Sequence, residues 1–171
     1  GSTVRAYLDI ETTYDGAISI VGVYRPDMGT IQLIGAGVHD VALFETLEGV
    51  RTIVTFNGSG FDLPVIRRRL LVDLRRDFEH CDLMHICRRR GLRGGLKRVE
   101  TMLGIARATA GLSGWDAPRL WHRYDVAGDR AALHTLLEYN REDVVNLAIM
   151  EERLGITPQS PTCTAVRHIF A

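Results

Sequence analysis

The fold is decided between residues 4 and 35, which read VRAYLDIETTYDGAISIVGVYRPDMGTIQLIG. Alternation predicts a strand over residues 4–10. One face of this strand would carry Ala6, Leu8 and Ile10, and the other Tyr7, Asp9 and Glu11. Two further apolar runs, 17–24 and 31–35, flank the turn RPDMGT. This spacing is typical of hairpins, so we expect the three strands to form an antiparallel meander.

Beyond the meander the pattern favours helices. Asp40 would cap a helix, a short buried strand is expected at 52–56, and Pro64 suits the first turn of a helix that ends near residue 71. Further helices are predicted at 83–90, 96–103 and from Asp129 to about Leu154, while residues 105–128 show no clear pattern. This order predicts an α/β fold in which a mixed sheet, three antiparallel strands and then parallel strands, has helices packed on it.

The composition indicates one globular domain. Of the 171 residues, 46% are hydrophobic and 25% are charged, and no apolar run approaches the ~18 residues of a membrane span. The three cysteines form no CxxC pair, which argues against a disulfide framework or a zinc site and favours a cytoplasmic location. We expect a single domain over residues 3–171 and interpret Gly1-Ser2 as a cloning remnant.

A basic segment lies between two acidic ones. The net charge of the chain is zero, but residues 67–107 hold twelve basic and five acidic residues, a net charge of +7. One interpretation is that these arginines are solvated on helix faces. The other is a surface that follows the phosphates of a nucleic acid beside an acidic metal site.

Asp9 and Glu11 are the first candidates for chemistry. They lie two positions apart on a predicted strand, so both carboxylates point to the same face, at the carboxyl end of the strand. Adjacent carboxylates repel each other unless a cation separates them, and oxygen ligands suit Mg²⁺ or Mn²⁺. Taken alone, the pair also fits a solvated strand end.

Two later positions supply further candidates. Asp62 begins a predicted helix, where it is either a favourable charge at the helix N-terminus or a metal ligand. Tyr139 and Asp143 lie four positions apart and would share one helix face, although Asn140 could instead cap a new helix with Asp143 at its third position. The neighbouring charges are interpreted as solvated: Glu138, Arg141 and Glu142.

Other common catalytic motifs are absent from the sequence. There is no GxGxxG or GxxxxGK[ST] phosphate loop, no GxSxG nucleophile elbow and no HExxH zinc motif. The candidate chemistry therefore rests on the carboxylates.

Taken together, the acidic residues resemble the DEDD superfamily of 3′–5′ exonucleases, which have a DnaQ-like, RNase H-like fold. LDIETT (8–13), FNGSGFDLP (56–64) and YNREDVVNL (139–147) look like its three motifs. Tyr139 matches the tyrosine of the DEDDy branch. Within that branch the chain most resembles the YprB-like RNase H-like domains, through CDLMHICRR, LKRVETMLGI and GDRAALHTLLEYNREDVVNLAIM. The resemblance spans residues 4–154.

The resemblance implies a metal-dependent 3′–5′ exonuclease that hydrolyses phosphodiester bonds at single-stranded ends by a two-metal mechanism. The cofactors would be two divalent cations, Mg²⁺ or Mn²⁺. By this analogy Asp9 bridges both ions, Glu11 and Asp143 complete one site, and Asp62 holds the second ion. Tyr139 would orient the attacking water.

The substrate would be single-stranded DNA or RNA, without a membrane partner, and further nucleic-acid-processing domains could be fused to this one. The residues expected to contact the substrate or its water are Thr12, Asn57, Phe61, Arg89, Arg93 and Lys97. Two alternatives stay open from the sequence. One is an RNase H-like structure-specific endonuclease with the same acids, and the other is a nucleic-acid-binding module without turnover.

Overall fold

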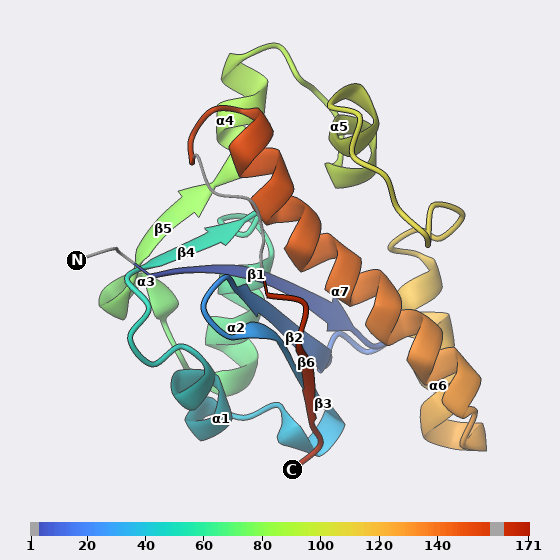
Figure 1. The fold of residues 1–171 in the computed structure, drawn as a ribbon. Helices are drawn as coiled ribbons and strands as arrows, with labels where there is room; N and C mark the ends of the chain where they lie inside the picture. Colours follow the sequence, from blue (N-terminus) through green and yellow to red (C-terminus); the bar gives the residue numbers. More distant parts are fainter. Residues whose placement is uncertain (1–3, 158–162) are drawn as a thin grey trace.

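A single mixed sheet organises the molecule (Figure 1). The computed structural model describes residues 4–157 and 163–171. Its strands are β1 (Arg5–Thr12), β2 (Ile18–Arg25), β3 (Gly29–Ile34), β4 (Thr52–Thr55), β5 (Glu79–Asp82) and β6 (Val166–Ile169). They lie in the order β5-β4-β1-β2-β3-β6. β1, β2 and β3 pair antiparallel, whereas β4, β5 and β6 pair parallel to their neighbours, so the predicted meander and mixed sheet are confirmed.

Helices cover both faces of this sheet (Figure 1). The helices are α1 (Asp40–Thr46), α2 (Asp62–Leu70), α3 (Leu74–Asp77), α4 (Leu83–Arg89), α5 (Leu96–Met102), α6 (Asp116–Ala127) and α7 (Arg130–Arg153), with a 3₁₀ turn η1 (Gly35–Gly37) before α1. The long helix α7 crosses one face of the sheet, and α1 and α2 pack on the opposite face.

The alternation of β1 divides the core between these two faces. Leu8 packs in one cluster with Leu43 of α1 and Ile66 of α2. Tyr7 packs on the other side, in a cluster with Val144 of α7. Because side chains alternate along a strand, Asp9 and Glu11 continue the Tyr7 face and therefore point towards α7.

Close packing brings α7 against the sheet beside Asp9. Gly22 pairs with Asp9 across β1 and β2. A Cβ atom at Gly22 would lie only 2.0 Å from Oδ1 of Asn140, so the absence of a side chain makes room for this residue of α7. Asn140 lies inside the continuous helix, and the alternative that it caps a new helix is wrong. The predicted cap at Asp129 is confirmed, since its side chain accepts a hydrogen bond from the N–H of Ala132.

Several elements differ from the prediction. Asp40 is the first residue of α1 rather than its cap, because the ring of His39 accepts the hydrogen bond from Ala42 N–H. The stretch 105–128 contains α6, and β6 adds a strand parallel to β3 after the last predicted helix. Gly1 and Ser2, interpreted above as a cloning remnant, lie outside the described residues. Within the described ranges, no helix has the length and apolar character needed to cross a bilayer.

Candidate active site

Three carboxylates meet where the carboxyl end of β1 faces the middle of α7. Asp9 and Glu11 come from β1 and Asp143 from α7, and one oxygen of each lies within 4.8 Å of the others. The side-chain amide of Asn140 donates hydrogen bonds to the backbone oxygen and to Oδ2 of Asp9, at 3.3 and 3.4 Å. The structure thus brings together three of the four acids that the sequence singles out.

This cluster is electrostatically strained. Burial, followed by the charges of Asp143, Glu11 and Asp62, raises the pKa of Asp9 well above its ordinary value. Burial and the Asp143 charge likewise raise the pKa of Glu11 to about 8. Oε1 of Glu11 is buried and has no hydrogen-bond partner among the described residues. Crowded carboxylates with an unused oxygen have the donor set that a divalent cation requires, so the residues present fit such an ion.

Asp62 approaches the cluster from the first turn of α2. It is 3% exposed, and its Oδ2 accepts a hydrogen bond from the backbone N–H of Ile10 at 3.0 Å. Burial raises its pKa to about 7, although the Ile10 N–H opposes this shift. The group of three carboxylates within 4.8 Å does not include Asp62. Asp62 therefore lies next to the cluster and is hydrogen-bonded to β1, the strand that carries Asp9 and Glu11.

Two basic side chains neutralise part of this charge, and both reach the same oxygen. Nζ of Lys97 and Nη2 of Arg107 each lie 2.8 Å from Oδ1 of Asp143. Burial disfavours the Lys97 ammonium, but the Asp143 carboxylate outweighs this effect and raises the pKa of Lys97. The sequence predicts that Lys97, in the basic segment, contacts phosphate, and the structure places its ammonium against the Asp143 carboxylate. Arg107 was not predicted.

Arg107 is held firmly, whereas Lys97 has one ionic partner among the described residues. Nη1 of Arg107 lies 2.8 Å from Oε2 of Glu100, and Nη2 donates to the backbone oxygen of Tyr139 at 3.1 Å. The side chains of Arg107 and Glu100 are 5% and 1% exposed. The amide of Asn146 also donates to Glu100, at 2.6 Å. A buried network therefore ties α5, the following loop and α7 together behind the carboxylates.

Tyr139 lies beneath these two cations. Nζ of Lys97 is 4.5 Å and the guanidinium carbon of Arg107 5.1 Å from the centre of its ring. Burial and the charge of Asp143 raise the pKa of Tyr139 to about 12. The phenol is therefore protonated at neutral pH, so it is able to donate or accept a hydrogen bond but is unsuited to act as a base.

A cleft of about 380 Å³ opens over the cluster. Its lining includes Asp9, Glu11, Tyr139 and Asp143, together with four of the predicted contacts: Thr12, Asn57, Phe61 and Lys97. Phe61 is 44% exposed. Arg89 and Arg93 are exposed but do not line the cleft, so their contact with a substrate stays a prediction.

Asp82 fixes the loop that carries Asn57. Asn57 adopts a left-handed backbone with φ of 62°, and its N–H donates to Oδ1 of Asp82 at 2.8 Å. The N–H and hydroxyl of Ser59 donate to Oδ2 of Asp82. Oδ1 also accepts the N–H of Met84 and so caps α4. Asp82 is thus a structural acid that orders one wall of the cleft.

The interpretation of Glu142 as a solvated charge is wrong. Glu142 is 8% exposed, and its two oxygens accept hydrogen bonds from the N–H groups of Ala108 and Thr109, at 2.7 and 2.9 Å. It secures the loop between α5 and α6 against α7. Glu138 and Arg141 form an ion pair that is about one-third exposed, as expected for a solvated pair.

Comparisons with known proteins agree with this architecture. Residues 6–155 match the family model of the RNase H superfamily. Among solved structures, the family B DNA polymerase from the hyperthermophilic archaeon Pyrobaculum calidifontis is similar, with a TM-score of 0.67 and 18% sequence identity. The similarity covers 89% of this chain but only 24% of the polymerase chain. No curated protein sequence matches the chain.

Proposed function

The chain belongs to the RNase H superfamily, a superfamily of nucleases, and from this premise we propose that it is a metal-dependent 3′–5′ exonuclease acting on single-stranded nucleic acid. The observation that carries the proposal is the group of Asp9, Glu11 and Asp143 at the floor of an open cleft. The similar structure belongs to a DNA polymerase, which is compatible with a nucleic acid substrate.

The carboxylates would supply the cofactor site. Asp9, Glu11 and Asp143 would hold divalent cations, with Asp62 completing the set, and we propose two ions, Mg²⁺ or Mn²⁺. Such ions polarise phosphate oxygens and make water a stronger nucleophile at neutral pH. Asn140 would keep Asp9 in place through its two hydrogen bonds.

The remaining side chains would bind the substrate or orient the attacking water. Lys97 faces the cleft, so its ammonium would contact the phosphate beside the carboxylates. Tyr139 keeps its proton and would orient water through its hydroxyl group. Thr12 and Phe61 line the same cleft and would flank the terminal nucleotide, and Asn57 would hold a water or a carboxylate.

The proposed hydrolysis follows from this arrangement. The oxygen of a water molecule forms a new bond to phosphorus, and the bond between phosphorus and the 3′ oxygen of the preceding nucleotide breaks. That 3′ oxygen leaves with a proton, so each turnover releases one nucleoside 5′-monophosphate and a strand shorter by one nucleotide.

A circular single-stranded substrate distinguishes this exonuclease from an endonuclease with the same acids. The purified protein would be incubated with Mn²⁺ and either a 5′-labelled linear strand, the same strand with a covalent 3′ block, or a circular single strand. We expect stepwise shortening of the free linear strand and resistance of the other two. Efficient cutting of the circle would replace the exonuclease by an endonuclease and leave the metal chemistry in place.

A further inference from the structure

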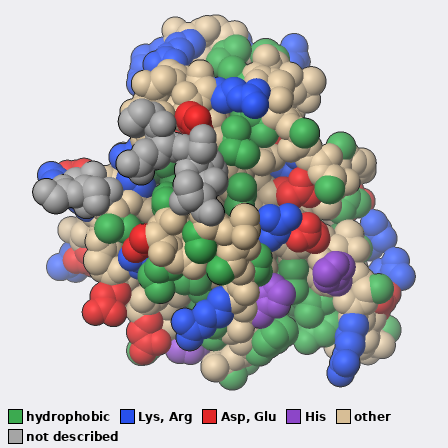
Figure 2. All heavy atoms as spheres, viewed as in Figure 1, with side chains coloured by type: hydrophobic (Ala, Val, Ile, Leu, Met, Phe, Trp, Pro, Cys, Tyr) green, Lys and Arg blue, Asp and Glu red, His purple; other side chains and the backbone are tan. Residues whose placement is uncertain are grey.

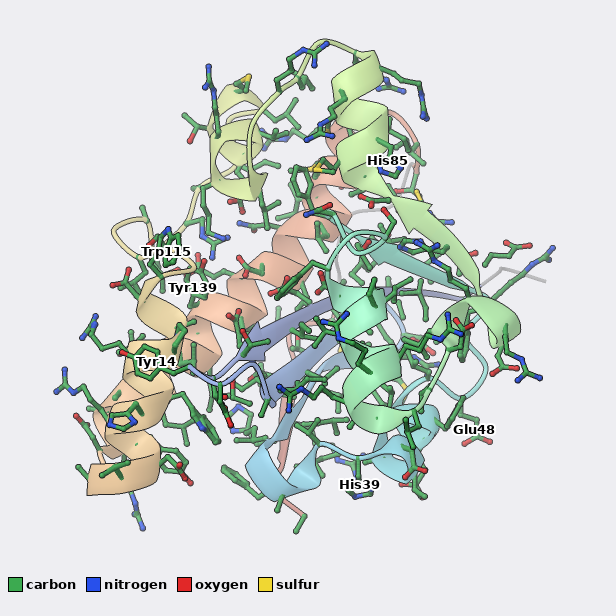
Figure 3. The ribbon with its side chains drawn as sticks, turned by 180° about the vertical axis from the view of Figure 1, so that it is seen from behind. Tyr14, His39, Glu48, His85, Trp115 and Tyr139 are labelled. Atoms are coloured by element: carbon green, nitrogen blue, oxygen red, sulfur yellow. The ribbon has the colours of Figure 1, made fainter. Side chains whose placement is uncertain are left out.

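Two exposed aromatic side chains flank the cleft on the side of α6, and neither has a part in the chemistry above. Trp115 is 92% exposed and Tyr14 68% exposed. Trp115 follows Gly114, which lines the cleft together with Tyr139 and Asp143. Figure 3 shows Trp115 on the loop between α5 and α6, on the same side of the molecule as Tyr139, and Tyr14 beside α6.

Trp115 is exposed on a loop that is otherwise well anchored. The loop from residue 106 to 115 is joined to α7 by hydrogen bonds from Ala108 and Thr109 to Glu142 and from Asn146 to the oxygen of Ala106. At its other end the N–H of Ser113 donates to Asp116, 2.8 Å away, in the first turn of α6. The indole is therefore presented to solvent by an ordered backbone.

Tyr14 is placed by the same helix. Its ring packs edge-on against His122 of α6, with 5.7 Å between ring centres. It follows the catalytic end of β1, three positions after Glu11. α6 therefore links the two rings, because Trp115 immediately precedes its first turn and His122 lies two turns further along.

We propose that Trp115 and Tyr14 form a stacking platform for the nucleobases of a single strand as it leaves the cleft. The proposal rests on the nucleic acid substrate of the proposed function and adds a binding site to it. Every nucleobase has an aromatic face, so stacking of this kind holds a strand without reading its sequence. Bases in a duplex already stack on one another, so the platform favours single strands.

The surface around the platform is consistent with recognition by stacking rather than by charge alone. α6 carries acidic and basic residues together: Asp116, Arg119, Arg123 and Asp125. On the opposite face, Figure 2 shows Lys and Arg side chains spread over the surface rather than gathered in one stripe. Because the charges of α6 itself are mixed, the platform would supply contacts that they do not.

Fluorescence of Trp115 tests the platform directly. Trp121 is the other tryptophan in the sequence, so Trp121→Phe leaves Trp115 as the single indole reporter. The measurement uses this background with Asp9→Asn, to prevent hydrolysis, and titrates a short oligothymidine or a version of it with one abasic position. We expect the oligonucleotide to change Trp115 fluorescence. When the abasic position is moved along the strand, we expect it to weaken binding most at the position that stacks on the platform.

Substitution at Trp115 then separates stacking from other contacts. Trp115→Ala should weaken binding of the intact oligonucleotide roughly 5- to 150-fold, the effect of losing one stacked base, with affinity measured by anisotropy of a labelled strand. It should not further weaken binding of the strand that is abasic at the sensitive position. Trp115→Phe should retain most of the affinity. Val126→Ala is the control, because Val126 is 70% exposed on the same helix, three turns from Trp115.

The outcomes are distinct. Equal affinity of the parent protein and Trp115→Ala would overturn the platform and leave the proposed function standing. Failure of the parent protein to bind any oligonucleotide, DNA or RNA, would overturn both. A thermal unfolding curve of Trp115→Ala that matches the parent would show that lost affinity does not come from lost folding.

Discussion

Arg107 and Asp143 are joined by an ion pair of 2.8 Å in which both side chains are 5% exposed. The same guanidinium holds Glu100, so one buried cation connects the acidic cluster to α5. The proposed nuclease site would thus be stabilised by cations of the chain as well as by those it would bind. This arrangement makes the stability of the fold and the chemistry of the site dependent on each other.

Removal of Arg107 should therefore destabilise the fold. Arg107→Ala leaves the buried Glu100 carboxylate without its cation, which costs about 3–5 kcal/mol when one partner of a buried pair is lost. Urea unfolding at neutral pH measures this loss, and Arg98→Ala, an exposed position on α5, provides the control. A loss below about 1 kcal/mol, the range of exposed pairs, would show that the network contributes little.

The metal-free protein should lose stability as the pH rises. The pKa of Glu11 is raised from 4.5 to about 8 and that of Asp62 from 3.8 to about 7, so the folded state favours the protonated forms. Their contribution to the free energy of unfolding is complete below their ordinary pKa values. It is lost as the pH rises to the folded-state pKa values of about 7 and 8. Melting temperatures measured in EDTA should thus fall from about pH 5 to about pH 8, with no further fall from these two groups at higher pH. Addition of Mn²⁺ at pH 8 should reverse the fall.

Glu11→Gln provides the control for this pH dependence. An uncharged amide cannot ionise, so the variant should show a shallower fall over the same range. A melting temperature that stays constant from pH 5 to pH 8 in the unsubstituted protein would contradict the raised pKa values.

Tyr139 and Asp143 should differ in their effect on turnover. Asp143→Asn removes a proposed metal ligand and should abolish most activity. Tyr139→Phe removes only a hydroxyl group that would orient water, and we expect a loss of about 10- to 1000-fold, as for one positioned polar group. Single-turnover rates make this comparison. An unchanged rate for Tyr139→Phe would exclude the hydroxyl from the chemistry.

The basic residues of segment 67–107 should differ in function: some should only bind phosphate, whereas Lys97 should also affect turnover. Arg89→Ala and Arg93→Ala should weaken binding of all sequences alike, and each lost phosphate contact should lower the salt slope by about 0.7 for a single strand. Lys97→Ala should also slow turnover, because Lys97 lies in the cleft. Arg130→Ala, at an exposed position at the start of α7, is the control. An unchanged slope for Arg89→Ala and Arg93→Ala would mean that these arginines are only solvated.

The sequence predicts those parts of the site that lie on regular elements. The period of β1 places Asp9 and Glu11 on one face, and the helical spacing of Tyr139 and Asp143 places both on α7. The mixed sheet follows from the same periods. These features depend on local spacing, which is visible in one sequence.

The missing parts depend on contacts between distant segments. Arg107 lies in a loop without periodicity, and its partners Glu100 and Asp143 are brought to it only by the fold. Glu142 looks like a surface charge because its partners are two backbone N–H donors of the α5–α6 loop, and a backbone donor cannot be recognised from residue type. The strand β6 is four residues long and largely exposed, too short for a clear alternation.

The proposed function requires the clustered carboxylates to hydrolyse a strand from its 3′ end with a divalent cation. The most direct measurement is the product ladder from a 5′-labelled single strand incubated with Mn²⁺ and either the unsubstituted protein or Asp9→Asn. We predict a ladder that shortens by one nucleotide at a time, which excess EDTA stops and which Asp9→Asn fails to produce while remaining folded. Full activity in excess EDTA or in Asp9→Asn, or no hydrolysis of either DNA or RNA, would contradict the account.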